Sequence, residues 1–414
     1  MKVKGLFLSM CAIAALASCS QNDDVTAPAG SDAPEAQVTL KLEGDGVNSR
    51  VAGDLEEATE EGAKVKNVTV FFFNQTDFIV GAPQYVDDAN TLETTPLKTT
   101  TDATQIVVIA NLGEELATSS FQGVSSLSQL KKVDFSAIDN TAGVKVNQSA
   151  TNLYSSGIGE ISMGSGEAAN IGTAIVQLHF ISARINQVKF SWKDGQHYAA
   201  NASEFNDDDN TWFYIKQVYM MKAQTNSPLL PFDATKNGTW SSGSFIPQTY
   251  AFAGGVSWGN APWVWPGDES TTPVQTNDYL VNTMPTTSTT SIDNVLGDKA
   301  WYLFENPSAS SYPTGLIVEI VWRSIENSTN PDELLSKYFT VYFGEKAGVA
   351  GTRPLLEAGK TYDMAISLTG SLEPGGNSSG GGDNPDTPSV DADITVTVNA
   401  AQWTTTAEIV KEFQ

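Results

Sequence analysis

Apolar and polar side chains alternate with a period of two residues at many places along this chain of 414 residues. The alternation is clearest at residues 362–368, where it continues without a break. Successive side chains of a β-strand point to opposite faces of a sheet, so this pattern predicts half-buried strands. Further strands are predicted at residues 38–42, 65–73, 105–110, 171–192, 212–221, 316–322 and 338–343.

Helical patterns are scarce by comparison. Residues 127–133 predict one short helix packed on a sheet, and residues 226–296, rich in Thr, Ser, Gly and Pro, predict long loops. The run at 105–110 is apolar at almost every position and predicts a strand buried on both faces. Regular strands with few helices predict a mainly β fold of two β-sandwich domains.

Charge and cysteine content exclude several classes of function. The chain has 23 basic and 48 acidic residues and a formal net charge of −25, which argues against nucleic acid or an anionic lipid surface as partner. Its two cysteines, Cys11 and Cys19, lie in or at the edge of an N-terminal leader. The mature fold is therefore expected to have no disulfide and to depend on packing alone.

The leader has a basic start, Lys2 and Lys4, and an apolar run from Leu6 to Ala17. This run is shorter than the about 20 residues that a membrane-spanning helix needs. Residues 16–19, Leu-Ala-Ser-Cys, resemble the lipobox at which bacterial lipoproteins are cut and acylated. Lipidated Cys19 would then anchor the protein to a membrane, since palmitate and similar acyl chains bind stably when several are attached.

The C-terminal tail combines a spacer with well-patterned strands. Residues 371–391 are rich in Gly, Ser, Asn and Pro, and residues 394–398 then alternate as a strand does, before Trp403 and a second apolar segment at 409–413. A strand on a flexible spacer is not expected as part of a closed domain. It is natural for a strand that pairs with something else.

The first predicted strand and the tail present the same apolar face. Val38, Leu40 and Leu42 alternate with polar residues as the apolar residues of 394–398 do. A groove that accepts one set should accept the other, because the pleat decides which face is buried. Burial of three such side chains stabilises by roughly 1.5–3 kcal/mol each, so an empty groove should be prone to aggregation.

Several segments together resemble the fimbrillins of Bacteroidales, which are pilins exported as lipoprotein precursors. The resemblance covers nearly the whole chain and rests on residues 16–19, 67–73, 106–111, 161–164, 304–307, 362–366 and 396–403. It implies two transthyretin-like, Greek-key β-sandwich domains in tandem, few short helices and an extended C-terminal donor tail.

The resemblance also implies a mechanism of assembly. In this family the first strand completes the N-terminal sandwich until an arginine-specific protease removes it, and a C-terminal strand of a neighbouring subunit then fills the groove. Carried over, the displaced strand contains Val38, Leu40 and Leu42, and the cut falls between Arg50 and Val51. Arg50 is the only basic residue between Lys41 and Lys64. Donor residues are then expected among Ile394, Val396, Val398, Trp403, Ile409 and Phe413.

The expected organisation follows from these boundaries. It comprises a signal peptide at 1–19, a propeptide with the first strand at 20–50, β-sandwich domains at 51–182 and 183–370, and a spacer with donor strands at 371–414. Expected partners are copies of the same chain or related pilins, the outer membrane before maturation, and a host or bacterial surface glycan or protein. The expected location is the outer membrane and then the surface fimbrium, where the protein serves adhesion.

Sites for catalysis, metals or cofactors are not expected. Gly164–Ala169 fits a dinucleotide fingerprint only superficially, because no βαβ unit surrounds it, and a turn is favoured. The two histidines, His179 and His197, are accompanied by no cysteine cluster, so zinc is not expected. The acidic run at 207–209 lacks the spaced ligands of a calcium loop.

One aromatic cluster leaves an alternative open. Trp258, Trp263 and Trp265 could stack on sugar rings or could pack against the sandwich, and packing is favoured. If they bind sugar, the chain would be a glycan-binding surface lipoprotein that does not polymerise. The tail discriminates between the two hypotheses, because such a binding module has no use for a detachable strand.

Overall fold

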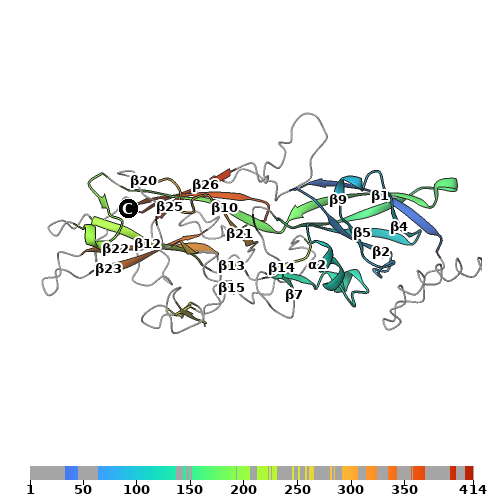
Figure 1. The fold of residues 1–414 in the computed structure, drawn as a ribbon, viewed down its shortest axis with the longest axis horizontal. Coiled ribbons are helices and arrows are strands. Elements are labelled where there is room, and N and C mark those ends of the chain that lie inside the picture. The colour runs from blue at the N-terminus through green and yellow to red at the C-terminus, as the bar shows by residue number, and fades with distance from the viewer. Residues whose placement is uncertain are drawn as a thin grey trace, which may run out of the picture.

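A computed structural model describes the fold of the chain. It describes residues 33–44, 64–136, 143–145, 149, 152–192, 194–205, 212–221, 223–224, 226–230, 245–246, 250–251, 257–258, 261–264, 280–281, 284, 291–305, 314–323, 334–342, 356, 358–368, 392–397 and 406–413. The molecule is elongated, with strands of the N-terminal half gathered at one end and strands of the C-terminal half at the other (Figure 1). Within these residues, no helix is both long enough and apolar enough to cross a membrane.

The N-terminal half is built on a seven-stranded sheet with the order β3-β2-β5-β8-β9-β1-β4. Its strands are β1 (Glu35–Gly44), β2 (Val68–Asn74), β3 (Gln84–Val86), β4 (Leu97–Thr100), β5 (Ala103–Ala110), β8 (Ser155–Met163) and β9 (Ile171–Phe180). Each strand is antiparallel to its neighbours except for the parallel pair β1 and β9. The predicted turn at Gly164–Ala169 is confirmed, since it joins the antiparallel strands β8 and β9 and contains the 3₁₀ turn η3 (Gly166–Ala168).

This sheet curls so that its two ends enclose one apolar core. Phe72 of β2 and Val108 of β5 share a buried cluster with Val38 and Leu40 of β1 and Val176 of β9. Strand β5 is buried on both faces, as its sequence predicts: Ile106, Val108 and Ala110 belong to this cluster, and Val107 and Ile109 to a second one. The curled sheet thus behaves as a sandwich whose two layers are parts of one sheet.

A second cluster covers the outer face of β2 and β5. It is formed by α2 (Glu114–Ser119), α3 (Leu127–Leu130), β6 (Asp134–Ser136) and β7 (Gly143–Lys145), whose apolar residues pack on Phe71 and Phe73. The predicted helix at 127–133 is therefore present but is only one turn long. Ser126 caps its N-terminus: the Ser126 hydroxyl accepts a hydrogen bond from the Gln129 amide, as N-capping serines do.

The C-terminal half is a sandwich of two sheets. One has the order β20-β10-β24-β26-β25, with β21 also paired to β10, and the other has the order β11-β12-β22-β23, with β19 also paired to β12. The first comprises β10 (Ser182–Trp192), β20 (Ser291–Ile292), β21 (Trp301–Phe304), β24 (Thr361–Leu368), β25 (Ala392–Thr397) and β26 (Thr406–Phe413). The second comprises β11 (His197–Tyr198), β12 (Trp212–Met221), β19 (Leu280–Val281), β22 (Gly315–Arg323) and β23 (Leu334–Tyr342).

The core of this sandwich lies between the two sheets and follows the predicted alternation. Buried residues of β10 and β24 from one sheet meet buried residues of β12 and β22 from the other. In β24, Tyr362, Met364, Ile366 and Leu368 are buried while Asp363, Ala365 and Ser367 are half-buried. The mainly β, tandem-sandwich fold predicted from the sequence is thus confirmed.

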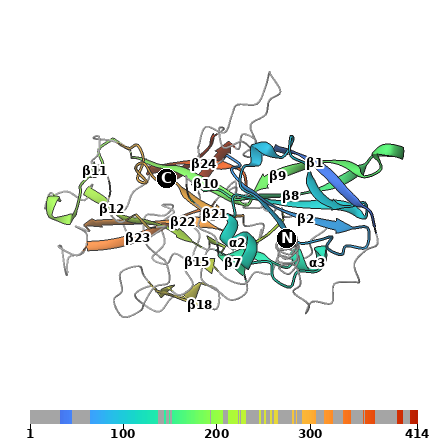
Figure 2. The ribbon, with the colours of Figure 1, turned by 45° about the vertical axis from the view of Figure 1, so that its right-hand side comes forward.

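The two halves are joined by a continuous backbone and by packing. Only Ile181 separates β9 from β10, so one long stretch of strand runs from one half into the other (Figure 1). A short strand, β14 (Asn226–Pro228), pairs with β6 of the N-terminal half, and Leu229, Leu230 and Phe304 join the cluster around Phe71. The halves lie at opposite ends in the rotated view as well (Figure 2). The predicted domain limits at 182 and 183 remain a prediction.

The C-terminal strands lie on the chain's own C-terminal sheet. β26 runs parallel to β24, and β25 runs antiparallel to β26 and is paired with no other described strand. The two strands expected from the sequence are therefore present, and in this structure they extend the sheet of their own chain. This pairing was not foreseen, because the sequence indicated a strand that pairs elsewhere.

Besides β12 and β14, short elements make up most of the described parts of residues 202–264. They are η4 (Ala202–Glu204), β13 (Ala223–Gln224), β15 (Phe245–Ile246), β16 (Tyr250–Ala251), β17 (Ser257–Trp258) and β18 (Ala261–Val264); the N-terminal half adds η2 (Ala89–Thr91). Trp258 lies on β17 and Trp263 on its neighbour β18, whereas Trp265 and residues 207–209 lie outside the described residues.

Two glycines of β8 allow the backbone of β9 to approach this strand closely. A Cβ atom at Gly157 would overlap the carbonyl oxygen of Gln177, and one at Gly159 would overlap that of Ile175. These contacts are with backbone, which cannot move aside as the end of a flexible side chain can. Close approach of β8 and β9 at this point therefore requires glycine.

We expect Gly157→Val and Gly159→Val each to lower the free energy of unfolding by about 1–3 kcal/mol or more, because each overfills this contact. Thermal or urea unfolding of the purified precursor measures the change. Ile158→Val is the matched control: Ile158 lies between the two glycines and is 42% exposed, so its stability should stay within about 0.5 kcal/mol of the parent. Equal stability of all three variants would contradict the assigned role of the glycines.

Candidate functional site: the first strand and its groove

The first strand lies inside the N-terminal sheet, not at its edge. Residues Gln37–Gly44 of β1 pair in parallel with Ile171–Leu178 of β9, and Glu35–Val38 pair antiparallel with Leu97–Thr100 of β4. β1 therefore separates β4 from the rest of the sheet. This strand therefore fills a groove bounded by β9 and β4.

The inward residues of β1 belong to the core. Val38 and Leu40 are 0% exposed and Ala36 is 3% exposed, and Leu42 is half-buried against the same cluster. The three residues singled out from the alternation, Val38, Leu40 and Leu42, thus do share a face, and that face is apolar and enclosed. Leu97 of β4 and Val176 of β9 are among the residues that pack around them.

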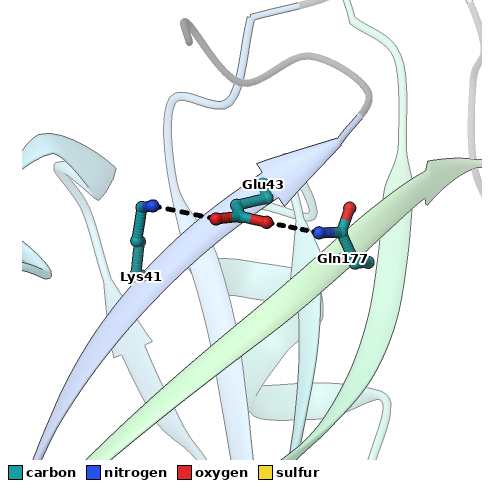
Figure 3. A network of polar contacts seen from close by, with 3 residues as sticks. All are labelled: Lys41, Glu43 and Gln177. Atoms are coloured by element: carbon teal, nitrogen blue, oxygen red, sulfur yellow. Dashed lines mark hydrogen bonds and ion pairs between the residues drawn. The ribbon is translucent and has the colours of Figure 1, made fainter. Parts of the chain in front are cut away.

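The outward face of β1 carries a small polar network (Figure 3). The Lys41 ammonium group forms an ion pair of 2.8 Å with the Glu43 carboxylate, and the Gln177 amide of β9 donates a hydrogen bond to the other oxygen of Glu43. The hydrogen bond and the charge of Lys41 lower the pKa of Glu43, and Glu43 in turn raises the pKa of Lys41. Both groups face solvent, so this network adds little to stability.

Strand β1 ends where only glycine fits. Gly44 has a φ of +91°, which residues with a Cβ rarely adopt, and a Cβ there would overlap the carbonyl oxygen of Leu178. The predicted cleavage residues Arg50 and Val51 follow a few positions later and lie outside the described residues.

A buried asparagine holds the chain where it re-enters the described structure. The side chain of Asn111 donates hydrogen bonds to the carbonyls of Lys64 (2.9 Å) and Leu153 (2.7 Å) and accepts one from the Lys66 amide (2.8 Å). Asn111 is 4% exposed and has a φ of +65°, at the end of β5. The start of the segment that leads into β2 is therefore fixed by contacts that do not involve β1.

This role of Asn111 was not expected from the sequence. An asparagine directly after a run of buried strand residues was the available signal, because asparagine tolerates the left-handed conformation better than most residues. Its hydrogen-bond partners come from positions 42 to 47 residues away, which local patterns do not reveal.

The remaining predicted site residues are only partly described. Ile394 and Val396 lie on β25, and Ile409 and Phe413 lie on β26. Cys19, Val398 and Trp403 lie outside the described residues. In the described part of the chain, no group of three or more His, Cys, Asp or Glu side chains is placed to hold a metal ion.

Two family models match the chain, one on each half. The model of the FimA major fimbrial subunit protein matches residues 36–175, and the model of the C-terminal domain of FimA-like major fimbrial subunits matches residues 237–403. This chain belongs to the FimA family of fimbrial subunits. The first match begins at Ala36, so it includes the strand that fills the groove.

A comparison with solved structures finds proteins similar to this FimA-family chain, and the first of them shares its fold. A Bacteroides eggerthii protein with a proposed role in cell adhesion has 22% identity and a TM-score of 0.55, over 92% of this chain and 98% of its own. A Parabacteroides distasonis protein of the same description has 16% identity and a TM-score of 0.45, over 92% and 96% of the two chains. The Porphyromonas gingivalis fimbrial anchor protein Mfa2 has 8% identity and a TM-score of 0.29, over 73% and 81%. No curated protein matches by sequence comparison.

Membership of the FimA family establishes the general character of the protein. FimA-type chains are structural subunits of fimbriae, so the location is the cell surface and assembly with other fimbrial components is implied. The predicted resemblance to fimbrillins is thereby confirmed.

We expect Leu40→Ala to lower the free energy of unfolding of the precursor by about 2–5 kcal/mol, because it leaves a cavity where a side chain is fully enclosed. Urea unfolding of the purified precursor measures the loss. Gln37→Ala on the exposed face of the same strand is the control and should change stability by less than about 0.5 kcal/mol. Equal effects of the two substitutions would show that β1 is not part of the core.

Proposed function

We propose that this FimA-family chain is a pilin that is exported as a lipoprotein precursor and polymerises by donor-strand exchange. In the precursor, lipid on Cys19 anchors the chain to the outer membrane and β1 fills the groove between β9 and β4. Cleavage between Arg50 and Val51 frees β1, and a C-terminal strand of a neighbouring copy takes its place. Repetition builds an adhesive, non-enzymatic fimbrium.

The position of β1 is the observation that carries this proposal. β1 supplies buried residues to the core, yet it precedes all other described elements and is followed by an undescribed segment, residues 45–63. Removal of Val38 and Leu40 alone would forfeit roughly 1.5–3 kcal/mol of burial each. It would also leave the backbone edges of β9 and β4 without partners, and such edges readily pair with another strand.

The attachment of residues 64–67 supports cleavage in the preceding segment. Asn111 binds the backbone of Lys64 and Lys66, the Ala89 amide donates to the Lys66 carbonyl (2.9 Å), and the Asn111 amide donates to the Asn67 carbonyl (2.9 Å). A cut at Arg50 would therefore separate β1 from a body in which residues 64–67 are already held. β2 would keep its place in the sheet.

The tail supplies a strand that suits the vacated groove. β25 carries Ile394 and Val396 at the spacing of Val38 and Leu40, and an undescribed segment of 23 residues joins it to β24. An extended chain of that length spans up to about 80 Å, so the tail can reach another subunit without disturbing β24.

The first test concerns maturation. Purified surface filaments should contain subunits that begin at Val51, as N-terminal sequencing would show, and Arg50→Ala should leave precursor in the membrane fraction. Arg50→Lys is the informative control, because it keeps the charge but removes the site for an arginine-specific protease. Filaments whose subunits retain residues 33–44 would contradict the removal of β1.

The second test concerns the donor strand. Ile394→Asp with Val396→Asp would place two unpaired charges in an apolar groove, which costs several kcal/mol, so filaments should be lost. Thr395→Asp with Thr397→Asp adds the same charge on the alternate face of β25 and should reduce assembly far less. Electron microscopy and sedimentation of matured protein measure the difference. Equal assembly by the two double variants would argue against insertion of β25.

A further inference from the structure

We propose that residues 226–230 act as a strap that fixes the C-terminal half on the N-terminal half, so that the two halves move and unfold as one body. The strap consists of β14 and the two residues that follow it, Leu229 and Leu230. The contacts described for it do not involve β1. The strap therefore holds whether or not β1 is in place.

The chain is tied to the C-terminal half before and after the strap. Ala223 of β13 belongs to the core of the C-terminal sandwich, and β13 pairs antiparallel with β15, which follows the strap in the sequence. Between these two strands the chain reaches the N-terminal half, where Asn226–Pro228 pair with Asp134–Ser136 of β6. The Leu229 amide also donates a hydrogen bond to the Val133 carbonyl (3.3 Å). A segment of one half is thus part of a sheet of the other.

The two leucines of the strap complete a core of the N-terminal half. Leu229 is 0% exposed and Leu230 is 6% exposed, and both belong to the cluster that covers the outer face of β2 and β5. Phe71 of β2 and Leu130 of α3 are members of this outer cluster as well. Release of the strap would therefore open a core of the N-terminal half. Unfolding of that half would in turn expose apolar side chains that belong to the C-terminal half.

Strand β21 adds a second set of contacts between the halves. Trp301 and Leu303 are buried in the core of the C-terminal sandwich, whereas Phe304 joins the outer cluster of the N-terminal half. Tyr302 packs with Phe180, the last residue of β9. Domains of one chain generally move relative to each other unless the interface between them is large and apolar. Because buried apolar residues are shared here, hinge motion at the link between β9 and β10 is not expected.

The strap lies between the two regions that the family models match. The first region ends at residue 175 and the second begins at residue 237, so residues 226–230 belong to neither. The strap nevertheless supplies two buried side chains to the outer cluster, whose other members come mostly from the first region. The first region alone therefore lacks part of the core that it has in the whole chain.

The positions of the tryptophans allow the two halves to be followed separately. All nine tryptophans lie at or after residue 192, so intrinsic fluorescence reports on the C-terminal half. Pulsed hydrogen exchange of peptides from β2 and β5, measured by mass spectrometry, reports on the N-terminal half. In urea, the purified precursor should unfold with the same midpoint by both probes, as a single cooperative unit does. Two separate midpoints in the parent protein would overturn the proposal.

Leu40→Ala tests whether damage to one half reaches the other. Leu40 is buried in the core that the curled N-terminal sheet encloses, a different cluster from the one that the strap joins. We expect the fluorescence midpoint of this variant to fall by the same amount as the midpoint of exchange in β2 and β5. An unchanged fluorescence midpoint would show that the halves unfold independently. None of these measurements requires cleavage or assembly, so their outcome is independent of the proposed function.

A matched pair of variants isolates the contribution of the strap. Leu229 and Leu130 are both 0% exposed and belong to the same cluster, but only Leu229 comes from the strap. With Leu130→Ala, both midpoints should fall together. With Leu229→Ala, the N-terminal half should unfold at lower urea than the C-terminal half. Coincident midpoints in both variants would contradict the role of the strap.

Hydrogen exchange of the parent protein gives a test that requires no variant to fold. If residues 226–230 hold the halves together, their amides should exchange only through the opening that also exposes β5. Peptides that cover 226–230 should then show the same dependence of exchange on urea as peptides from β5. Exchange of the strap at urea concentrations that leave β5 protected would overturn the proposal, even if Leu229→Ala could not be purified.

Discussion

The N-terminal half of this protein depends on one parallel strand pairing. β1 meets β9 residue for residue over eight positions, and its inward side chains complete a core whose other members come mostly from the rest of the curled sheet. β1 also holds β4 in the sheet, because β4 is bonded to no other described strand. The sheet of this half is therefore completed by a strand whose covalent link to the rest of the half is the segment 45–63.

The parts of the fold that depend on local alternation could be predicted from the sequence. The apolar face of Val38, Leu40 and Leu42, the doubly buried β5 and the regular β24 all follow from a period of two residues. The helix at 127–133 was predicted too long. Beyond Leu130 the chain turns into β6, whose Phe135 is buried in the cluster that α3 also joins.

What could not be predicted depends on contacts between distant residues. Nothing in the pattern of β26 indicates that β24 is its partner, since any alternating strand could occupy that edge. Likewise, the role of Asn111 depends on backbone groups 42 to 47 residues away. Glycine usually weakens a strand, so the sequence alone does not show that Gly157 and Gly159 are required where β9 approaches β8. Pairing and close approach are properties of the assembled sheets.

The near-continuous run of β9 into β10 has a mechanical consequence. These strands lie roughly along the length of the molecule (Figure 1), and each forms a parallel ladder, β9 with β1 and β10 with β24. A pull on the two ends of the molecule loads such ladders in shear, so that many hydrogen bonds resist together. A pull across the strands would instead open them one at a time. The single chain is therefore strongest under a pull along its own length.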